Sequence, residues 1–125
     1  MDISTLNAHF DKLKQLAKTT ELLNGLKAAD ADSGGLFAAE IDDLTVQIER
    51  EQAAISESEG NISAWISGIE DNMTRMIFRL RFLRGLQWCE VAGYIGKACT
   101  EDCVKSAAYR YLSAERRSAA RRSGA

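Results

Sequence analysis

An apolar side chain recurs at every seventh position through the middle of this chain. The positions are Ile41, Ile48, Ile55, Ile62, Ile69, Met76 and Leu83. A sustained seven-residue repeat is typical of a helix whose apolar side faces a partner helix. The sequence contains no proline, the residue that interrupts helices most strongly. The sequence therefore predicts an all-α fold.

Residues 2–29 supply the simplest partner helix. Their apolar stripe advances in steps of three and four through Ile3, Leu6, Phe10, Leu13, Ala17 and Thr20, and is widened by Leu16, Leu23 and Leu26. The adjacent Gly34 and Gly35 favour a helix stop and a turn. A second helix from Leu36 then folds back as an antiparallel, coiled-coil-like hairpin. Gly60-Asn61 leaves open whether this long helix is continuous or starts anew there.

The repeat extends further than the first helix can cover. At 1.5 Å per residue, a helix of about 28 residues that folds back reaches roughly position 63. Ile66, Ile69 and Met73 then need cover from the C-terminal helices or from another chain. We expect a homodimer or a higher homo-oligomer.

The charges are divided between the two halves of the chain. Residues 1–71 carry five Lys and Arg against 14 Asp and Glu, a net charge of −9. Residues 72–125 carry eleven against four, a net charge of +7, which leaves −2 overall. A basic segment at one end is typical of a surface for a polyanion, although a solvated face has the same composition.

Two helices joined by a tight turn are predicted in the basic half. Gly85 ends the preceding helix, a short helix runs from Gln87 to Ile95, and Gly96 closes it. Thr100 caps the last helix, which has acidic residues in its first turn where the helix dipole favours them. Such a pair is the body of a helix-turn-helix, whose second helix enters the major groove of DNA.

The core of this motif is expected on one side of each helix. Trp88 joins the two helices, and Ala92 is the small residue where they cross closely. The other core positions are Val91, Ile95, Val104, Ala107, Ala108, Tyr111 and Leu112.

The segment TRMIFRLRFLRGLQWCEVAGYIG resembles the fourth region of sigma factors. It is more similar to the sigma-70 region 4-like family of small phage and prophage helix-turn-helix proteins, which also carry an N-terminal helical hairpin. The matching pieces are Leu80-Arg81-Phe82, Gly85-Leu86-Gln87-Trp88, Val91-Ala92, Ile95-Gly96, residues 97–105 and Arg110-Tyr111-Leu112. The resemblance covers about residues 60–113 by motif. Gln87 stands where serine is usual, and Lys97-Ala98 replaces two glycines.

The resemblance implies a sequence-specific DNA-binding regulator of phage or prophage transcription, with RNA polymerase as a candidate partner. The chain lacks a segment similar to the promoter-melting region, so we do not expect a complete sigma factor. The residues expected at double-stranded DNA are Arg84, Gln87, Lys97, Thr100, Lys105, Ser106, Tyr109 and Arg110. The clustering of Arg79, Arg81 and Arg84 favours phosphate contact over a merely solvated face.

Two other functions fit the same pattern. A small terminase-like DNA-packaging subunit also joins a helix-turn-helix to a helical oligomerisation segment. A structural coiled-coil protein could use its helix-turn-helix to contact another protein. The domains expected are an oligomerisation hairpin in residues 1–60, the helix-turn-helix in residues 61–113 and a basic tail in residues 114–125.

Nothing in the sequence predicts an enzyme, a cofactor or a metal. His9 is the only histidine, and no glycine-rich phosphate loop is present. Cys99 and Cys103 are four residues apart and offer half a metal site, but together with Cys89 they are better explained as reduced thiols. No apolar run is long enough to span a membrane and the N-terminus does not resemble a signal peptide. We expect a protein of the bacterial host cytoplasm.

Overall fold

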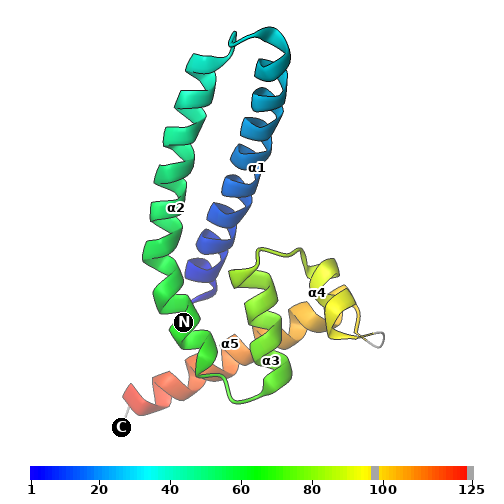
Figure 1. The fold of residues 1–125 in the computed structure, drawn as a ribbon. Helices are drawn as coiled ribbons and strands as arrows, with labels where there is room; N and C mark the ends of the chain where they lie inside the picture. Colours follow the sequence, from blue (N-terminus) through cyan, green and yellow to red (C-terminus); the bar gives the residue numbers. More distant parts are fainter. Residues whose placement is uncertain (97–98, 124–125) are drawn as a thin grey trace.

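The computed structural model describes residues 1–96 and 99–123, and every regular element within these ranges is a helix. Two long antiparallel helices, α1 (Ile3–Ser33) and α2 (Ala38–Ser67), form a hairpin. Shorter helices gather at its base (Figure 1). These are α3 (Asn72–Phe78), continued by the π-helical turn η1 (Arg79–Leu83), then α4 (Trp88–Ile95) and the longer α5 (Glu101–Ser123). The predicted all-α fold with an N-terminal helical hairpin is confirmed.

The turn of the hairpin is built by Asp30 and two glycines. Gly34 and Gly35 have φ angles of +71° and +99°, values that glycine adopts without strain. The carboxylate of Asp30 accepts a hydrogen bond from the backbone N–H of Phe37 at 2.8 Å, and its carbonyl accepts one from that of Gly35 at 3.3 Å. α1 therefore continues past the predicted end at residue 29 and stops at Ser33.

The apolar stripe predicted for α1 is correct near the base of the hairpin but wrong toward its turn. Ala17 and Thr20 are exposed, and Thr19 is buried instead. The Thr19 hydroxyl donates to a carboxylate oxygen of Glu51 on α2 at 3.1 Å. Two helices that wrap around each other keep their contact at a period of 3.5 residues, so the inward side shifts from a stripe drawn on a straight helix.

α2 is continuous through Gly60-Asn61 and ends only at Ser67. The break comes at Gly68, and Asp71 begins α3 by accepting a hydrogen bond from the backbone N–H of Thr74 at 2.9 Å. The sequence repeat runs across this break, so Met76 is 43% exposed and does not face a partner helix. The domain boundary expected after residue 60 falls inside α2.

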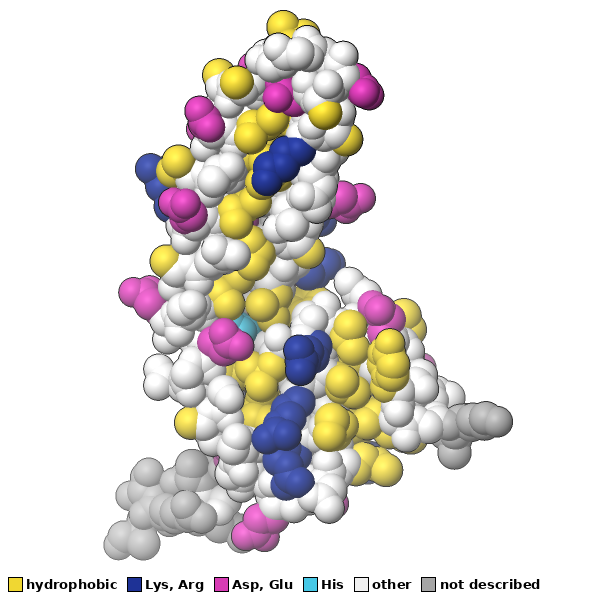
Figure 2. All heavy atoms as spheres, in the orientation of Figure 1, with side chains coloured by type: hydrophobic (Ala, Val, Ile, Leu, Met, Phe, Trp, Pro, Cys, Tyr) yellow, Lys and Arg dark blue, Asp and Glu magenta, His cyan; other side chains and the backbone are white. Residues whose placement is uncertain are grey.

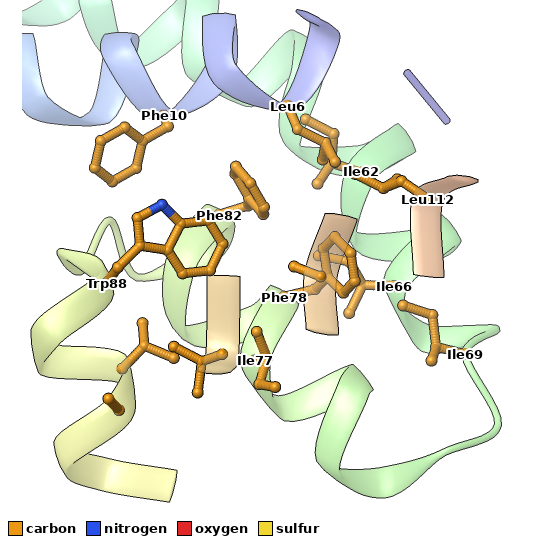
Figure 3. Packing of buried hydrophobic residues seen from close by; sticks show 14 residues of the cluster. Leu6, Phe10, Ile62, Ile66, Ile69, Ile77, Phe78, Phe82, Trp88 and Leu112 are labelled. Atoms are coloured by element: carbon orange, nitrogen blue, oxygen red, sulfur yellow. The ribbon is translucent and has the colours of Figure 1, made fainter. Parts of the chain in front are cut away.

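One hydrophobic core joins the base of the hairpin to the shorter helices. Leu6 and Phe10 reach it from α1, and the rings of Phe78 and Phe82 reach it from α3 and η1 (Figure 3). The Phe78 ring lies 5.1 Å from the ring of Trp65 on α2, measured between centroids. The hairpin and the helix-turn-helix are therefore packed together and share their buried side chains.

This core also covers two of the positions for which the sequence suggested a second chain. Ile66 is 0% exposed and Ile69 is 1% exposed, whereas Met73 remains 55% exposed. The C-terminal helices, not a partner chain, bury the two isoleucines. The burial of Ile66 and Ile69 therefore does not require a second chain, and the homo-oligomer stays a prediction.

α5 extends well past the predicted motif. It continues to Ser123, so the tail expected from residue 114 begins within the helix. Glu115 accepts hydrogen bonds from the indole N–H of Trp65 at 2.8 Å and from the α-amino group of Met1 at 2.6 Å. α5 therefore connects the helix-turn-helix to the base of the hairpin.

Candidate nucleic-acid interface

Local hydrogen bonds define the end of α4 and the start of α5. Gly96 has a φ of +152°, which favours glycine, and its N–H donates to the carbonyl of Ala92 at 3.3 Å. The Thr100 hydroxyl accepts from the N–H of Cys103 at 3.2 Å, which confirms the predicted cap. Lys97 and Ala98, where the sequence departs from the phage pattern, lie outside the described residues.

The predicted core of the helix pair is largely confirmed. Trp88 is 8% exposed, and Val91 and Ala92 on α4 are buried together with Val104 and Ala108 on α5. Ala92 is small enough to allow the two helices to approach closely. α4 and α5 are thus held as a compact pair with the outer side of α5 open.

The expected DNA-contacting residues of α5 are all exposed, but they occupy two flanks. Ser106 and Arg110 share one flank, where the Arg110 Nε–H donates to the Ser106 carbonyl at 3.4 Å. Lys105 and Tyr109, also four residues apart, share the other. Tyr109 is 39% exposed and lines a hollow of about 440 Å³ with Ile3 and other residues near the start of α1.

Arg84 and Gln87 lie near the ends of η1 and α4 and are exposed. Arg84 lines a hollow with Glu59 of α2 and with Arg79. Figure 2 shows basic side chains in a column over α3, and in Figure 1 α5 passes behind that helix. Arg84 is therefore placed beside α2. Gln87 precedes α4, and its backbone N–H donates to Glu90 Oε1 at 3.1 Å.

Acidic residues stand close to the outer side of α5. Glu101 and Asp102 are exposed in its first turn. The helix dipole stabilises acidic side chains there, but their negative charge repels phosphate groups. Glu101 and Asp102 therefore weaken the attraction of the start of α5 for phosphate groups.

Arg81 is the main error of the sequence-based prediction. It was expected with Arg79 and Arg84 on the surface, but it is 9% exposed. Its guanidinium lies 3.6 Å from the centroid of the Phe10 ring and 4.5 Å from that of Trp88, and it donates to the Leu86 carbonyl at 3.1 Å. Arg81 therefore joins α1 to α4 through cation–π contacts.

The burial of Arg81 has an electrostatic cost. Desolvation lowers the pKa of the guanidinium, and the nearby Tyr109, Asp11 and Glu101 raise it. No carboxylate forms an ion pair with it in the described structure. Arg81 stands three and four residues after Phe78 and Ile77, both buried, so its inward position could have been read from helical spacing.

His9 is a second buried polar group, between α1 and α2. It is 1% exposed, its Nδ1 lies 2.6 Å from Ser58 Oγ, and its Nε2 has no partner in the described structure. Burial lowers the pKa of His9, Glu59 opposes this effect and Lys12 adds to it. Burial in the hairpin therefore favours the neutral form of this imidazole.

We expect the free energy of unfolding to fall as the pH drops below about 6.5, the ordinary pKa of histidine. The unfolded chain binds a proton at His9 before the folded chain does, because the pKa is lowered in the fold. The contribution of His9 to the free energy of unfolding is complete above the pKa of the unfolded state. It is lost as the pH falls to the lower pKa of the folded state. Urea unfolding of the natural protein and of His9→Asn at neutral and mildly acidic pH measures this difference. An equal loss in both proteins would assign the pH dependence to other groups.

Residues 1–96 and 99–118 bring together no cluster of three metal-ligating side chains. The free thiols of Cys89 and Cys103 are exposed, and that of Cys99 is half-buried. Within the described segments, no helix has the length and apolarity required to cross a lipid bilayer.

The chain was compared with models of protein families, with curated proteins and with solved structures. No family, protein or structure matches it.

Proposed function

We propose that this chain binds double-stranded DNA through α4 and α5 and regulates transcription of phage or prophage genes in the cytoplasm of a bacterial host. The division of α5 into two sides carries the proposal. Val104 and Ala108 face the core, while Lys105, Ser106 and Arg110 are exposed. The second helix of a helix-turn-helix places such an outer side in the major groove.

The charge distribution supports the same function. The net charge of +7 in residues 72–125 favours phosphate groups, and the net charge of −9 in residues 1–71 disfavours contact of the hairpin with DNA. We assign base contacts to Ser106 and Arg110, since arginine can pair with guanine through two hydrogen bonds. Lys105, Tyr109 and Thr100 are assigned to the phosphate backbone, with Gln87 at the start of α4. RNA polymerase is the further partner that regulation of transcription implies.

A binding titration tests this function. The full chain is titrated against a mixed duplex pool and against duplexes selected from it, at two salt concentrations. Affinity should fall steeply with salt, by a logarithmic slope of about 0.9 for each phosphate neutralised. Arg110→Ala should cost roughly 1–3 kcal/mol on the selected duplex and relax the preference at one base pair.

Lys27→Ala is the matched control. Lys27 is exposed toward the outer end of α1, so its loss removes the same charge without touching α5. Equal losses for the two variants would contradict base contact by Arg110. If the full chain does not bind duplex DNA even at low salt, the helix-turn-helix contacts another protein and the proposed function is wrong.

A further inference from the structure

The π-helical turn η1 decides which side chains of the α3–η1 segment share a side. The backbone N–H of Arg84 donates to the carbonyl of Arg79 at 3.0 Å, a bond that spans five residues instead of four. Arg84 therefore stands one turn beyond Arg79 on the same side of the segment. In a regular α-helix the two side chains would be about 140° apart, at 3.6 residues per turn. Single π turns inside helices are frequent at functional sites.

Arg79 and Arg84 line one hollow together with two polar residues of α2. The hollow has a volume of about 360 Å³, and Glu59 and Ser63, one helical turn apart on α2, line it with Leu83. Both arginines are exposed. Neither forms an ion pair with a carboxylate within the described residues. Two guanidinium groups and one carboxylate give this lining a net charge of +1.

The other two arginines of this segment are held by contacts inside the chain. Arg75 donates to the carbonyl of Ile69 at 2.7 Å. Arg81 is buried, with its guanidinium against the ring of Phe10. Figure 2 shows basic side chains in a column over α3, and the two arginines of the hollow are the exposed ones of α3, η1 and the residue after it. These two cations are therefore accessible to a group from outside the chain.

We propose that this hollow binds a phosphate group, with the guanidinium groups of Arg79 and Arg84 and the hydroxyl of Ser63 as donors. A guanidinium group donates paired hydrogen bonds to phosphate oxygens, and a serine hydroxyl supplies one further donor. A net charge of +1 complements the single negative charge of a phosphodiester. It matches less closely the charge of about −1.5 to −2 that a phosphate monoester carries at neutral pH.

The phosphodiester backbone of DNA is therefore the expected source of the phosphate group. In this form the inference rests on the proposed function, and it adds a backbone contact at α2 and η1 to those assigned to α4 and α5. Such a contact fixes the protein on the duplex without reading its sequence. Free phosphate is the other source of the same group, and the two are separated below.

Glu59 limits the affinity of the hollow for an anion. Its carboxylate repels a phosphate group and attracts the guanidinium groups that the phosphate group requires. Replacement of this carboxylate by a neutral amide should therefore strengthen phosphate binding. Arginines that only solvate the surface would not respond to this replacement, so the response distinguishes a binding site from a solvated face.

Fluorescence anisotropy of a labelled duplex titrated with the full chain tests the site. The double variant Arg79→Gln, Arg84→Gln should weaken binding about tenfold on mixed and selected duplexes alike, and should lower the logarithmic salt slope by about 0.9, the value for one phosphate. Arg50→Gln is the matched control, because Arg50 is exposed on α2 but lies about 20 Å from Ser63 along the helix. Circular dichroism confirms that the variants are folded.

Glu59→Gln should strengthen duplex binding about threefold, since a repulsive charge close to the phosphate group is removed. Glu57→Gln removes the same charge from the same helix, but its side chain points about 200° away around α2 and does not line the hollow. Equal effects of these two variants overturn the proposal. A double arginine variant that behaves like Arg50→Gln also overturns it, while binding of the natural protein to duplex leaves the proposed function intact.

Inorganic phosphate separates the two sources of the phosphate group. If the natural protein does not bind duplex at low salt, the proposed function is wrong, and NMR of the arginine side-chain N–H groups with added inorganic phosphate decides on the hollow. Shifts confined to Arg79 and Arg84 and absent at Arg50 would support a site for free phosphate. Equal shifts at all three arginines would overturn the site.

Discussion

Trp88→Ala is expected to lower the free energy of unfolding by about 3–5 kcal/mol, the usual cost of removing a large buried aromatic side chain. Trp88 is 8% exposed. Its ring lies 6.1 Å from that of Phe82 between centroids and 4.5 Å from the Arg81 guanidinium. The variant leaves a cavity between α4 and η1 and also uncovers the charge of Arg81. A loss of this size is comparable to the whole stability of many small domains.

Tyr94→Ala is the control for this prediction. Tyr94 belongs to the same helix but is 74% exposed, so its removal should change stability by less than about 0.5 kcal/mol. Urea unfolding followed by far-ultraviolet circular dichroism compares the two variants. Similar midpoints for both would mean that Trp88 does not hold the helix pair together.

Leu6→Ala is expected to destabilise the helix-turn-helix, although Leu6 belongs to the hairpin. Leu6 is 0% exposed and lies in the shared core near Ile62 and Leu112 (Figure 3). Truncation of a buried leucine costs about 2–5 kcal/mol. Because the core is continuous, helix content and tryptophan fluorescence should be lost in one transition that shifts to lower urea concentration.

The fluorescence of Trp65 and Trp88 reports this shared core, whereas circular dichroism is dominated by the two long helices. Coincidence of the two curves is the criterion for one cooperative unit. Leu36→Ala serves as the control, since Leu36 is 71% exposed at the hairpin turn. Separate transitions would show that the hairpin and the helix-turn-helix unfold independently, as the predicted boundary after residue 60 implies.

The features that the sequence predicted well depend on neighbouring residues. α4 begins one residue after the predicted Gln87 and ends at the predicted Ile95. Thr100 caps α5, and Gly85 follows η1 with a φ of +71°. Caps and glycine turns are set by hydrogen bonds and backbone angles over a few residues, so the local sequence contains the information.

The errors involve contacts between distant parts of the chain. Arg81 is buried because Phe10, from α1, lies over its guanidinium. Helical spacing after Ile77 and Phe78 points this side chain inward, but its charge favours exposure, and nothing in the local sequence shows the ring that covers it. The end of α2 at Ser67 also depends on the core, since Ile66 and Ile69 on either side of it are buried there.

The candidate site also combines features set by local sequence with features set by distant contacts. Exposure of Lys105, Ser106 and Arg110 follows from helical period alone once Val104 and Ala108 are assigned to the core. The position of Arg84 beside Glu59 depends on how α2 passes η1, which no local pattern specifies. Sequence reasoning therefore gives the exposure of these three α5 residues but not the neighbours of Arg84, and the assignment of all four residues to DNA stays a prediction.

The position of the helix-turn-helix at the base of a long hairpin bears on how far the hairpin can reach. α1 leaves the shared core after Phe10 and continues to Ser33, a rise of roughly 35 Å at 1.5 Å per residue. One turn of duplex is about 34 Å. A partner bound at the turn of the hairpin would therefore be held about one duplex turn away from α4 and α5, and equal shortening of the two long helices would bring it closer.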